Sequence, residues 1–227
     1  MTLIIDSGYT DGGYTPGKLK LSRIQQYPAV IGEAFGGGFF AGYISHTEDG
    51  NPTHALIVAP RATGYSTTAT YSWKNALTTT AGTTSEFDGL ANTAAMVTAG
   101  IADHPAAEFC VNLSIGGYGD WYLPARYEMD IAYFHLKPTS NVNSVSAGTN
   151  IYAVPQRNSN YTTGYPAQTY VTAFTTSNEG FVTQLHSTST EAGASTNVTL
   201  NITDGTAGTT SAKTSARRVR AFRRIAL

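Results

Sequence analysis

The sequence has little cysteine, little charge and no long apolar run, and each shortage excludes a class of protein. Cys110 is the only cysteine among 227 residues, so neither an internal disulfide nor a cysteine-rich zinc site can form. Charged residues make up 13% of the chain and the formal net charge is -1, which gives no general attraction to nucleic acid or anionic lipid. No stretch approaches the roughly 18 apolar residues of a membrane-spanning helix. We therefore expect no nucleic-acid partner and no membrane insertion.

The abundant residues are uncharged and polar. Thr, Ser, Asn and Gly accompany fourteen tyrosines, and a hydrophobic content of 41% is ample for a buried core. Hydroxyl groups, amides and flat aromatic rings suit neutral polar ligands. Since the first residues lack a basic stretch followed by an apolar core, we expect no secretory signal. A binder of this kind without an export signal fits release from the cell inside a phage particle.

Residues 116–129 carry the most informative pattern, a glycine turn followed by Trp-x-Leu-Pro and the start of a helix. The glycines permit a tight turn, Trp121 and Leu123 share one face of a short extended segment, and Pro124 suits a first helical position. Apolar residues at helical spacing predict a helix over 125–136 and another over 89–100.

Two hairpins are predicted in the remaining chain. The apolar runs 36–44 and 55–60 are short enough for strands, and turn residues at 48–52 lie between them. Residues 170–176 and 181–186 have a similar strand character and are separated by a polar turn.

Further short elements are predicted at three places. A strand over 198–202 precedes a turn at Asp204-Gly205, and a C-terminal strand covers 218–225 with Val219, Ala221 and Phe222 near its inner side. Ser72 is a candidate N-cap for a short helix over 72–77.

The chain divides into an arm and one domain. Residues 1–29 contain turn pairs and one alternating segment, which favours an N-terminal anchoring or assembly arm, and residues 30–227 form the main domain. Two irregular stretches, 61–86 and 141–167, are long for a compact domain and indicate a functional role. The predicted class is α+β, with two helices, small antiparallel sheets and long loops.

Six short motifs follow one another along the chain: Gly-Gly-Phe-Phe-Ala-Gly (37–42), Leu-Ile-Val-Ala-Pro (56–60), Trp73 with Ala76, Gly-Asp-Trp-Tyr-Leu-Pro (119–124), Phe-Thr-Thr-Ser-Asn-Glu (174–179) and Val-Arg-Ala-Phe-Arg-Arg (219–224). In this order they resemble the C-type-lectin-like domains of bacterial surface adhesins and of phage fibre and other virion proteins. The resemblance covers about residues 30–227. It implies two helices flanking small antiparallel sheets, with long loops that display variable binding surfaces, and it fixes no ligand.

The sequence departs from two activities of related proteins. Calcium-dependent lectins carry Glu-Pro-Asn and Trp-Asn-Asp motifs, and neither string occurs here, so calcium is not an expected cofactor. The related formylglycine-generating enzymes need reactive cysteines, whereas Cys110 lies between the apolar Phe109 and Val111 and is interpreted as structural. The five histidines show no metal-ligand spacing. We expect no enzyme, no cofactor and no metal.

Several residues with reactive or basic side chains are given structural roles. Asp120, Glu128 and His135 suit a turn, the first turn of a helix and the exposed face of that helix rather than an acid-base group. Trp73 and Trp121 are expected in the core. Since strand residues alternate between two faces, the C-terminal arginines favour ion pairs and inter-subunit contacts over a nucleic-acid stripe; they are Arg217, Arg218, Arg220, Arg223 and Arg224.

The candidate ligand-binding residues are aromatic or amide side chains of the two long loops: Tyr65, Tyr71, Asn158, Asn160, Tyr161 and Tyr165. The alternative is that these side chains pack the loops against the domain. The leading functional hypothesis is a phage protein at the virion surface, on a fibre, tail or capsid, which binds a host cell-surface glycan or protein. The second is a decoration or assembly protein that contacts other virion proteins only. A homo-oligomer is expected, a trimer by analogy with phage fibres.

Overall fold

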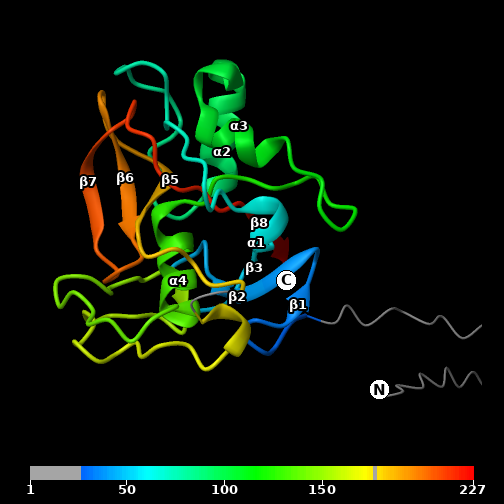
Figure 1. Ribbon diagram of the computed structural model, residues 1–227, viewed down its shortest axis with the longest axis vertical. Coiled ribbons are helices and arrows are strands. Elements are labelled where there is room, and N and C mark those ends of the chain that lie inside the picture. The colour runs from blue at the N-terminus through cyan, green and yellow to red at the C-terminus, as the bar shows by residue number, and fades with distance from the viewer. Residues whose placement is uncertain (1–26, 176–177) are drawn as a thin grey trace, which may run out of the picture.

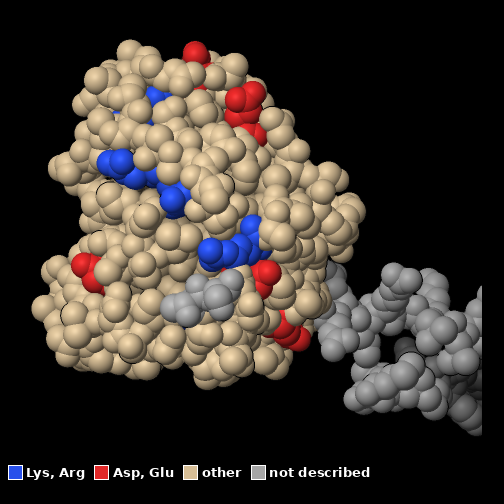
Figure 2. Space-filling view, viewed as in Figure 1, with Lys and Arg blue, Asp and Glu red and all other residues tan. Residues whose placement is uncertain are grey.

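The computed structural model describes residues 27–175 and 178–227. Residues 1–26 of the predicted N-terminal arm lie outside this described part. The described chain has an α+β fold, as predicted, in which two antiparallel sheets and several helices are joined by long irregular segments (Figure 1). Charged side chains are sparse on the face drawn in Figure 2, as the composition implies.

The first sheet has the strand order β1-β2-β3-β8. β2 (Gly38–Ile44) and β3 (His54–Val58) form the predicted hairpin, while β1 (Ala34–Phe35) pairs with β2. The C-terminal β8 (Phe222–Ala226) pairs with β3 and is shorter than the predicted strand over 218–225. β4 (Ala153–Val154) also pairs with β2.

Gly42 allows the long helix α4 (Arg126–Leu136) to lie against this sheet. Its φ of +135° follows an irregularity in the β2-β3 register, and a Cβ at this position would lie 2.8 Å from Ile131 Cγ2 and from His135 Cδ2. His135 is therefore half-buried against the sheet, which corrects the prediction of an exposed helix position.

Hydrophobic clusters cover both faces of the first sheet. Because successive side chains of a strand alternate, Leu56 points into a cluster around α4 and Ile57 points into a second cluster that contains Trp73 and Trp121. The predicted core role of both tryptophans is confirmed, since their exposed fractions are 0% and 2%.

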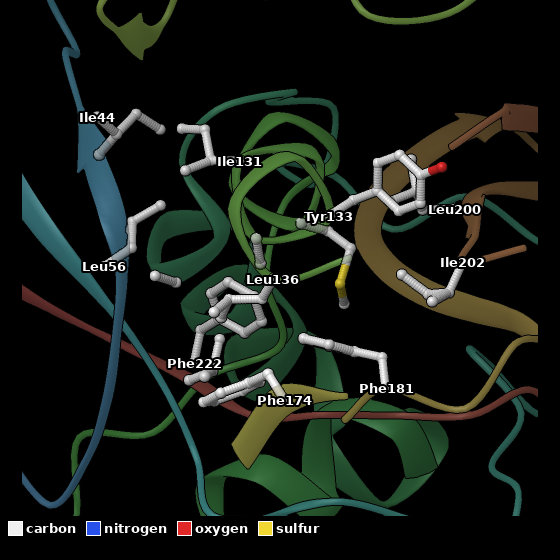
Figure 3. Close-up of a cluster of buried hydrophobic side chains, with 14 of the residues drawn as sticks. Ile44, Leu56, Ile131, Tyr133, Leu136, Phe174, Phe181, Leu200, Ile202 and Phe222 are labelled. Carbon is white, nitrogen blue, oxygen red and sulfur yellow. The ribbon is translucent and has the colours of Figure 1, made fainter. Parts of the chain in front are cut away.

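Helix α4 lies between the two sheets. In Figure 3, Ile44 and Leu56 of the first sheet lie on one side of the helix, and Leu200 and Ile202 lie on the other. The second sheet has the order β5-β6-β7, formed by β5 (Leu185–Gly193), β6 (Thr196–Asn201) and β7 (Ala207–Ala212). β6 corresponds to the predicted strand over 198–202, and the predicted Asp204-Gly205 turn leads into β7.

The other long helix, α2 (Gly89–Gly100), has the predicted bounds. Its N-cap is Asp88, which accepts a hydrogen bond from Ala91 N at 2.8 Å. The carboxylate of the buried Glu128 joins the starts of both helices, because its Oε2 accepts hydrogen bonds from Ala125 N (2.8 Å) and from Gly89 N (3.2 Å). Glu128 is thus placed in the first turn of α4, as predicted.

Shorter helices were not predicted. They are α1 (Arg61–Gly64), α3 (Pro105–Val111) and the two 3₁₀ turns η1 (Ile101–Asp103) and η2 (Thr172–Phe174). In α3, proline occupies one of the first two helical positions, where its missing N–H costs nothing.

Two predicted elements are wrong. Residues 170–176 and 181–186 form no hairpin in the described chain, because η2 directs the buried Phe174 inward and Phe181 is buried in the same cluster. The predicted helix over 72–77 is also missing there: Ser72 Oγ contacts Asn75 Oδ1 instead of a backbone N–H, and Lys74 N donates to Lys213 O.

Candidate functional site

A groove of about 620 Å³ opens beside α1. Its walls come from three stretches that are distant in sequence: residues of the 61–71 segment, Phe109 on α3, and Asn178 with Glu179. Tyr65 and Tyr71 of the predicted ligand-binding set line it.

An aromatic pair forms one wall of the groove. The half-buried rings of Tyr71 and Phe109 stack with centroids 4.9 Å apart and an interplanar angle of 29°. The backbone of Tyr71 is fixed by two hydrogen bonds with Arg217, of 2.9 and 3.0 Å. The hydroxyl side chains of Thr67 and Thr68 lie in the same lining. Flat rings next to hydroxyl groups suit a sugar ring or a polar protein segment.

A buried cation supports the floor of the groove. The Arg220 guanidinium has no exposed surface, and it lies 5.1 Å from the Tyr65 ring centroid and 4.5 Å from that of Phe181. Its Nε donates to Ala59 O (2.9 Å) and its Nη2 to Glu179 Oε2 (3.1 Å). Burial lowers the pKa of Arg220 to about 10, so the group remains charged at neutral pH.

Tyr65 is a structural residue of this floor more than a ligand platform. Its hydroxyl accepts a hydrogen bond from Val182 N at 2.6 Å and lies 2.7 Å from Nε2 of the buried His186. Burial lowers the pKa of His186 to about 3 and raises that of the Tyr65 phenol. His186 is therefore neutral at physiological pH, and its Nε2 accepts from the tyrosine when Nδ1 donates to Gln184 O.

The carboxylate of the groove and the nearby imidazole are hydrogen-bonded or buried. Glu179 is the one carboxylate in its described lining, and its Oε2 already accepts hydrogen bonds from Arg220 and from Arg61 N (2.6 Å). The imidazole of His186 lies behind Tyr65, fully buried. These contacts leave the Arg61 guanidinium, which bonds Gly180 O, together with stacking, hydroxyl and amide hydrogen bonding as the chemistry that the described lining offers.

The other four predicted residues do not line this groove. Tyr161 is buried, and its hydroxyl donates to Asp130 Oδ1 at 2.6 Å, so packing accounts for it. Asn158 and Asn160 are exposed, and Asn160 donates to Val145 O. The exposed Tyr165 packs against Phe134 in an edge-to-face arrangement. Of the six predicted ligand-binding residues, two therefore line the groove and four lie elsewhere.

Three groove residues were missed because their proximity depends on the fold. Phe109 lies on a helix that was not predicted, and Arg61 and Glu179 are 118 positions apart although they are hydrogen-bonded. Arg220 was not predicted as a groove residue, but the alternation of strand residues did predict ion pairs for the C-terminal arginines. The ion pairs Arg220–Glu179, Arg223–Asp120 and Arg224–Asp88 confirm it for three of the five.

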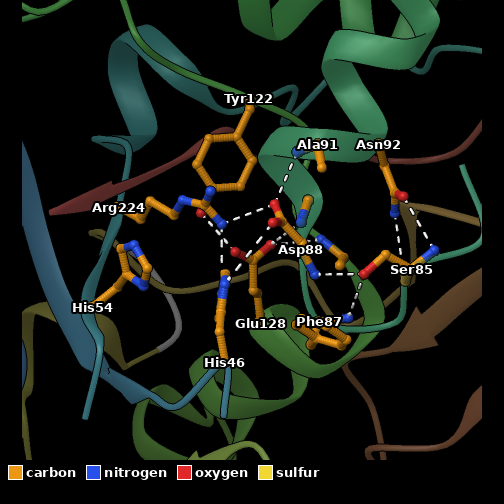
Figure 4. A network of polar contacts seen from close by, with 12 residues as sticks. His46, His54, Ser85, Phe87, Asp88, Ala91, Asn92, Tyr122, Glu128 and Arg224 are labelled. Atoms are coloured by element: carbon orange, nitrogen blue, oxygen red, sulfur yellow. Dashed lines mark hydrogen bonds and ion pairs between the residues drawn. The ribbon is translucent and has the colours of Figure 1, made fainter. Parts of the chain in front are cut away.

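A second polar cluster has a structural role (Figure 4). Arg224 Nη1 lies 2.8 Å from Asp88 Oδ1, and His46 Nδ1 lies 3.8 Å from Asp88 Oδ2. Burial lowers the pKa of His46 to about 4 and raises the pKa of Glu128 to about 7. Since these groups tie β8 and the segment that follows β2 to the starts of α2 and α4, the cluster joins the sheet to both helices.

Asp120, Glu128 and His135 have separate neighbours. Asp120 pairs with Arg223, Glu128 bonds the helix starts, and His135 packs against Gly42. Among residues 27–175 and 178–227, no group of three or more His, Cys, Asp or Glu side chains is arranged to hold a metal ion. No helix of that described part is long and apolar enough to cross a membrane.

Comparison of the chain with protein-family models, with curated proteins and with solved structures finds no match.

Proposed function

We propose that this chain is a non-enzymatic phage protein at the virion surface, with a C-type-lectin-like fold, that binds a host cell-surface glycan or protein through the groove at 61–71. The observation that carries the proposal is the stacked Tyr71–Phe109 wall beside the hydroxyls of Thr67 and Thr68. Irregular segments supported by a rigid buried floor are typical of recognition sites. The Gly-Asp-Trp-Tyr-Leu-Pro turn that leads into α4 supports the fold assignment.

The state of Cys110 supports a binding role over an enzyme of the formylglycine-generating type. The thiol is fully buried, its Sγ lies 3.4 Å from Ala106 O, and burial raises its pKa well above the usual value. A nucleophilic cysteine needs access and a thiolate, and both are disfavoured here.

The proposal is tested with the phage that encodes the chain. Mass spectrometry of purified virions must detect the protein, and the purified protein must compete with the phage for adsorption to host cells. We expect Tyr71→Ala to weaken this competition about fivefold or more, because stacking on an aromatic side chain, as known for nucleobases, contributes about 1–3 kcal/mol. Undiminished competition by a folded Tyr71→Ala protein would remove the groove from the proposal.

A second candidate function, decoration or assembly of the particle, is favoured by a different surface. The 138–175 stretch contains one charged residue, Arg157, which is paired with Asp130. It exposes large apolar side chains to solvent: Val142 by 69%, Val145 by 60% and Tyr170 by 79%. Such a surface suits a protein neighbour.

The two candidates separate in one experiment. Tyr170→Ser changes the loop surface and Tyr71→Ala changes the groove, so each variant is the control of the other. Loss of incorporation into particles by Tyr170→Ser alone, with no effect of Tyr71→Ala on adsorption, would favour assembly. Loss of adsorption by Tyr71→Ala alone favours receptor binding.

A further inference from the structure

A smaller groove of about 330 Å³ adjoins the first one. Its described lining holds two cationic side chains, Arg217 and Arg218, together with the neutral polar Thr70, Gln184 and Asn201. No carboxylate belongs to this lining. The groove therefore offers a positive site in a protein that has few charged residues.

The charges of both arginines are not neutralised within the described chain. None of the ion pairs between described residues includes Arg217 or Arg218, although each of the next three C-terminal arginines has an acidic partner. Arg218 bonds only neutral acceptors: its Nε donates to Gln184 Oε1 (2.8 Å) and its Nη1 to Ala69 O (3.0 Å). The side chain is thus held in place while its charge stays available.

Arg217 has an unused donor at this site. Among the described residues its buried Nε has no hydrogen-bond partner, and its Nη1 bonds only the carbonyl of the preceding Ala216 (3.1 Å). Buried polar atoms in native proteins nearly always have a partner, whereas no group of the described residues compensates this guanidinium. A carboxylate, sulfate or phosphate oxygen is the acceptor that guanidinium groups bind most strongly.

The two grooves are coupled through one short segment. Arg217 is bonded through its backbone to Tyr71, a wall of the first groove, and Arg218 Nη1 lies 3.4 Å from Ser66 O as well as 3.0 Å from Ala69 O. Thr70 lines the small groove, while its neighbours Ala69 and Tyr71 line the large one. A chain-like ligand on the Tyr71–Phe109 wall would therefore have the two arginines within reach of its next unit.

We propose that Arg217 and Arg218 form a subsite for the anionic group of an acidic saccharide, whose sugar ring occupies the adjoining Tyr71–Phe109 groove. The inference rests on the proposed function and narrows its ligand from any surface glycan or protein to a glycan that bears carboxylate, sulfate or phosphate.

The subsite itself is tested with sodium sulfate as the probe. Arginine Nε–H resonances of the ¹⁵N-labelled full chain are followed by NMR during the titration, with sodium chloride at equal ionic strength as the control. We expect saturable shifts at Arg217 and Arg218 and none at Arg126, a surface arginine paired with Glu86. Equal shifts at all arginines, or the same shifts in chloride, would show ionic strength alone and overturn the subsite.

The saccharide is tested with matched pairs that differ in charge: 3′-sialyllactose against lactose, and trigalacturonic acid against its methyl ester. At low salt we expect the acidic member of a bound pair to bind about tenfold more tightly, as one charge-assisted hydrogen-bond pair provides. Arg217→Gln should lower that ratio toward one, since only Arg218 would then remain at the subsite. Arg126→Gln removes the same charge elsewhere and should leave the ratio unchanged.

The outcomes distinguish the inference from the function on which it rests. Binding to cells or to neutral glycans without a preference for the acidic member overturns the inference and leaves the proposed function. Sulfate binding at Arg217 without binding to any saccharide or host cell overturns glycan recognition and leaves an anion subsite of another kind. An equal loss of preference in Arg126→Gln overturns the inference, because net charge alone would then explain it.

Discussion

Replacing Arg220 by alanine should lower the free energy of unfolding by about 4 kcal/mol. The guanidinium is fully buried and bonded to Ala59 O, to the Glu179 backbone and to the Glu179 carboxylate, which is itself only 21% exposed. Removing one partner of a buried pair costs about 3–5 kcal/mol, since the other is left without its counter-charge. The variant also loses the contacts with Tyr65 and Phe181 and leaves a void among them.

Arg223→Ala is the matched control on the same C-terminal segment. Arg223 also pairs with a carboxylate, but its partner Asp120 is 53% exposed, so solvent screens the pair and we expect a loss of about 1 kcal/mol or less. Urea unfolding followed by the fluorescence of the two buried tryptophans measures both values, and an unchanged m-value shows that the comparison is valid. A cost for Arg220→Ala within 1 kcal/mol of the control would refute the view that a buried ion pair supports the groove floor.

Three further predictions concern the packing and titration of buried residues. Gly42→Ala should destabilise the fold by about 2–3 kcal/mol in urea unfolding, because the positive φ and the contact with Ile131 both oppose a Cβ, whereas Gly164→Ala, with open space around it, should have little effect. His186 has a folded pKa near 3, below its unfolded value of about 6.5, so its contribution to stability is full well above pH 6.5 and is lost as the pH falls. Wild type should lose about 1–2 kcal/mol more than His186→Gln between pH 6.5 and pH 5, and equal slopes would contradict this. The Cys110 thiol should react with a thiol reagent only after unfolding in urea, and rapid reaction of the native protein would count against its burial.

The sequence was informative where local signals and burial agreed. The helix over 89–100 and the helix that ends at Leu136 have apolar spacing and start signals within one short window, and the hairpin of β2 and β3 has two apolar runs around a turn. The strand character of 170–176 and 181–186 misled, because Phe174 and Phe181 pack against the distant Arg220 and do not belong to paired strands.

The groove was predictable only in part. Tyr65 and Tyr71 were found from their loop context, yet burial makes Tyr65 part of the floor. Phe109 became a wall only through the packing of α3 beside Tyr71, and no local pattern in either segment specifies that contact. Pairings over such distances along the chain are set by the whole fold.

Arg218 fixes the backbone of residues 66–69 without contacting the side chains of Thr67 and Thr68 through hydrogen bonds. Its guanidinium donates hydrogen bonds to the main-chain oxygens of Ser66 and Ala69, and every amino acid has such an oxygen. Thr67 and Thr68, between these two anchor points, are therefore free to vary in side chain without releasing the loop. A collection of variants randomised at these two positions would keep one backbone shape while presenting many different surfaces. If the groove binds a receptor as proposed, its preference could then change without loss of the fold.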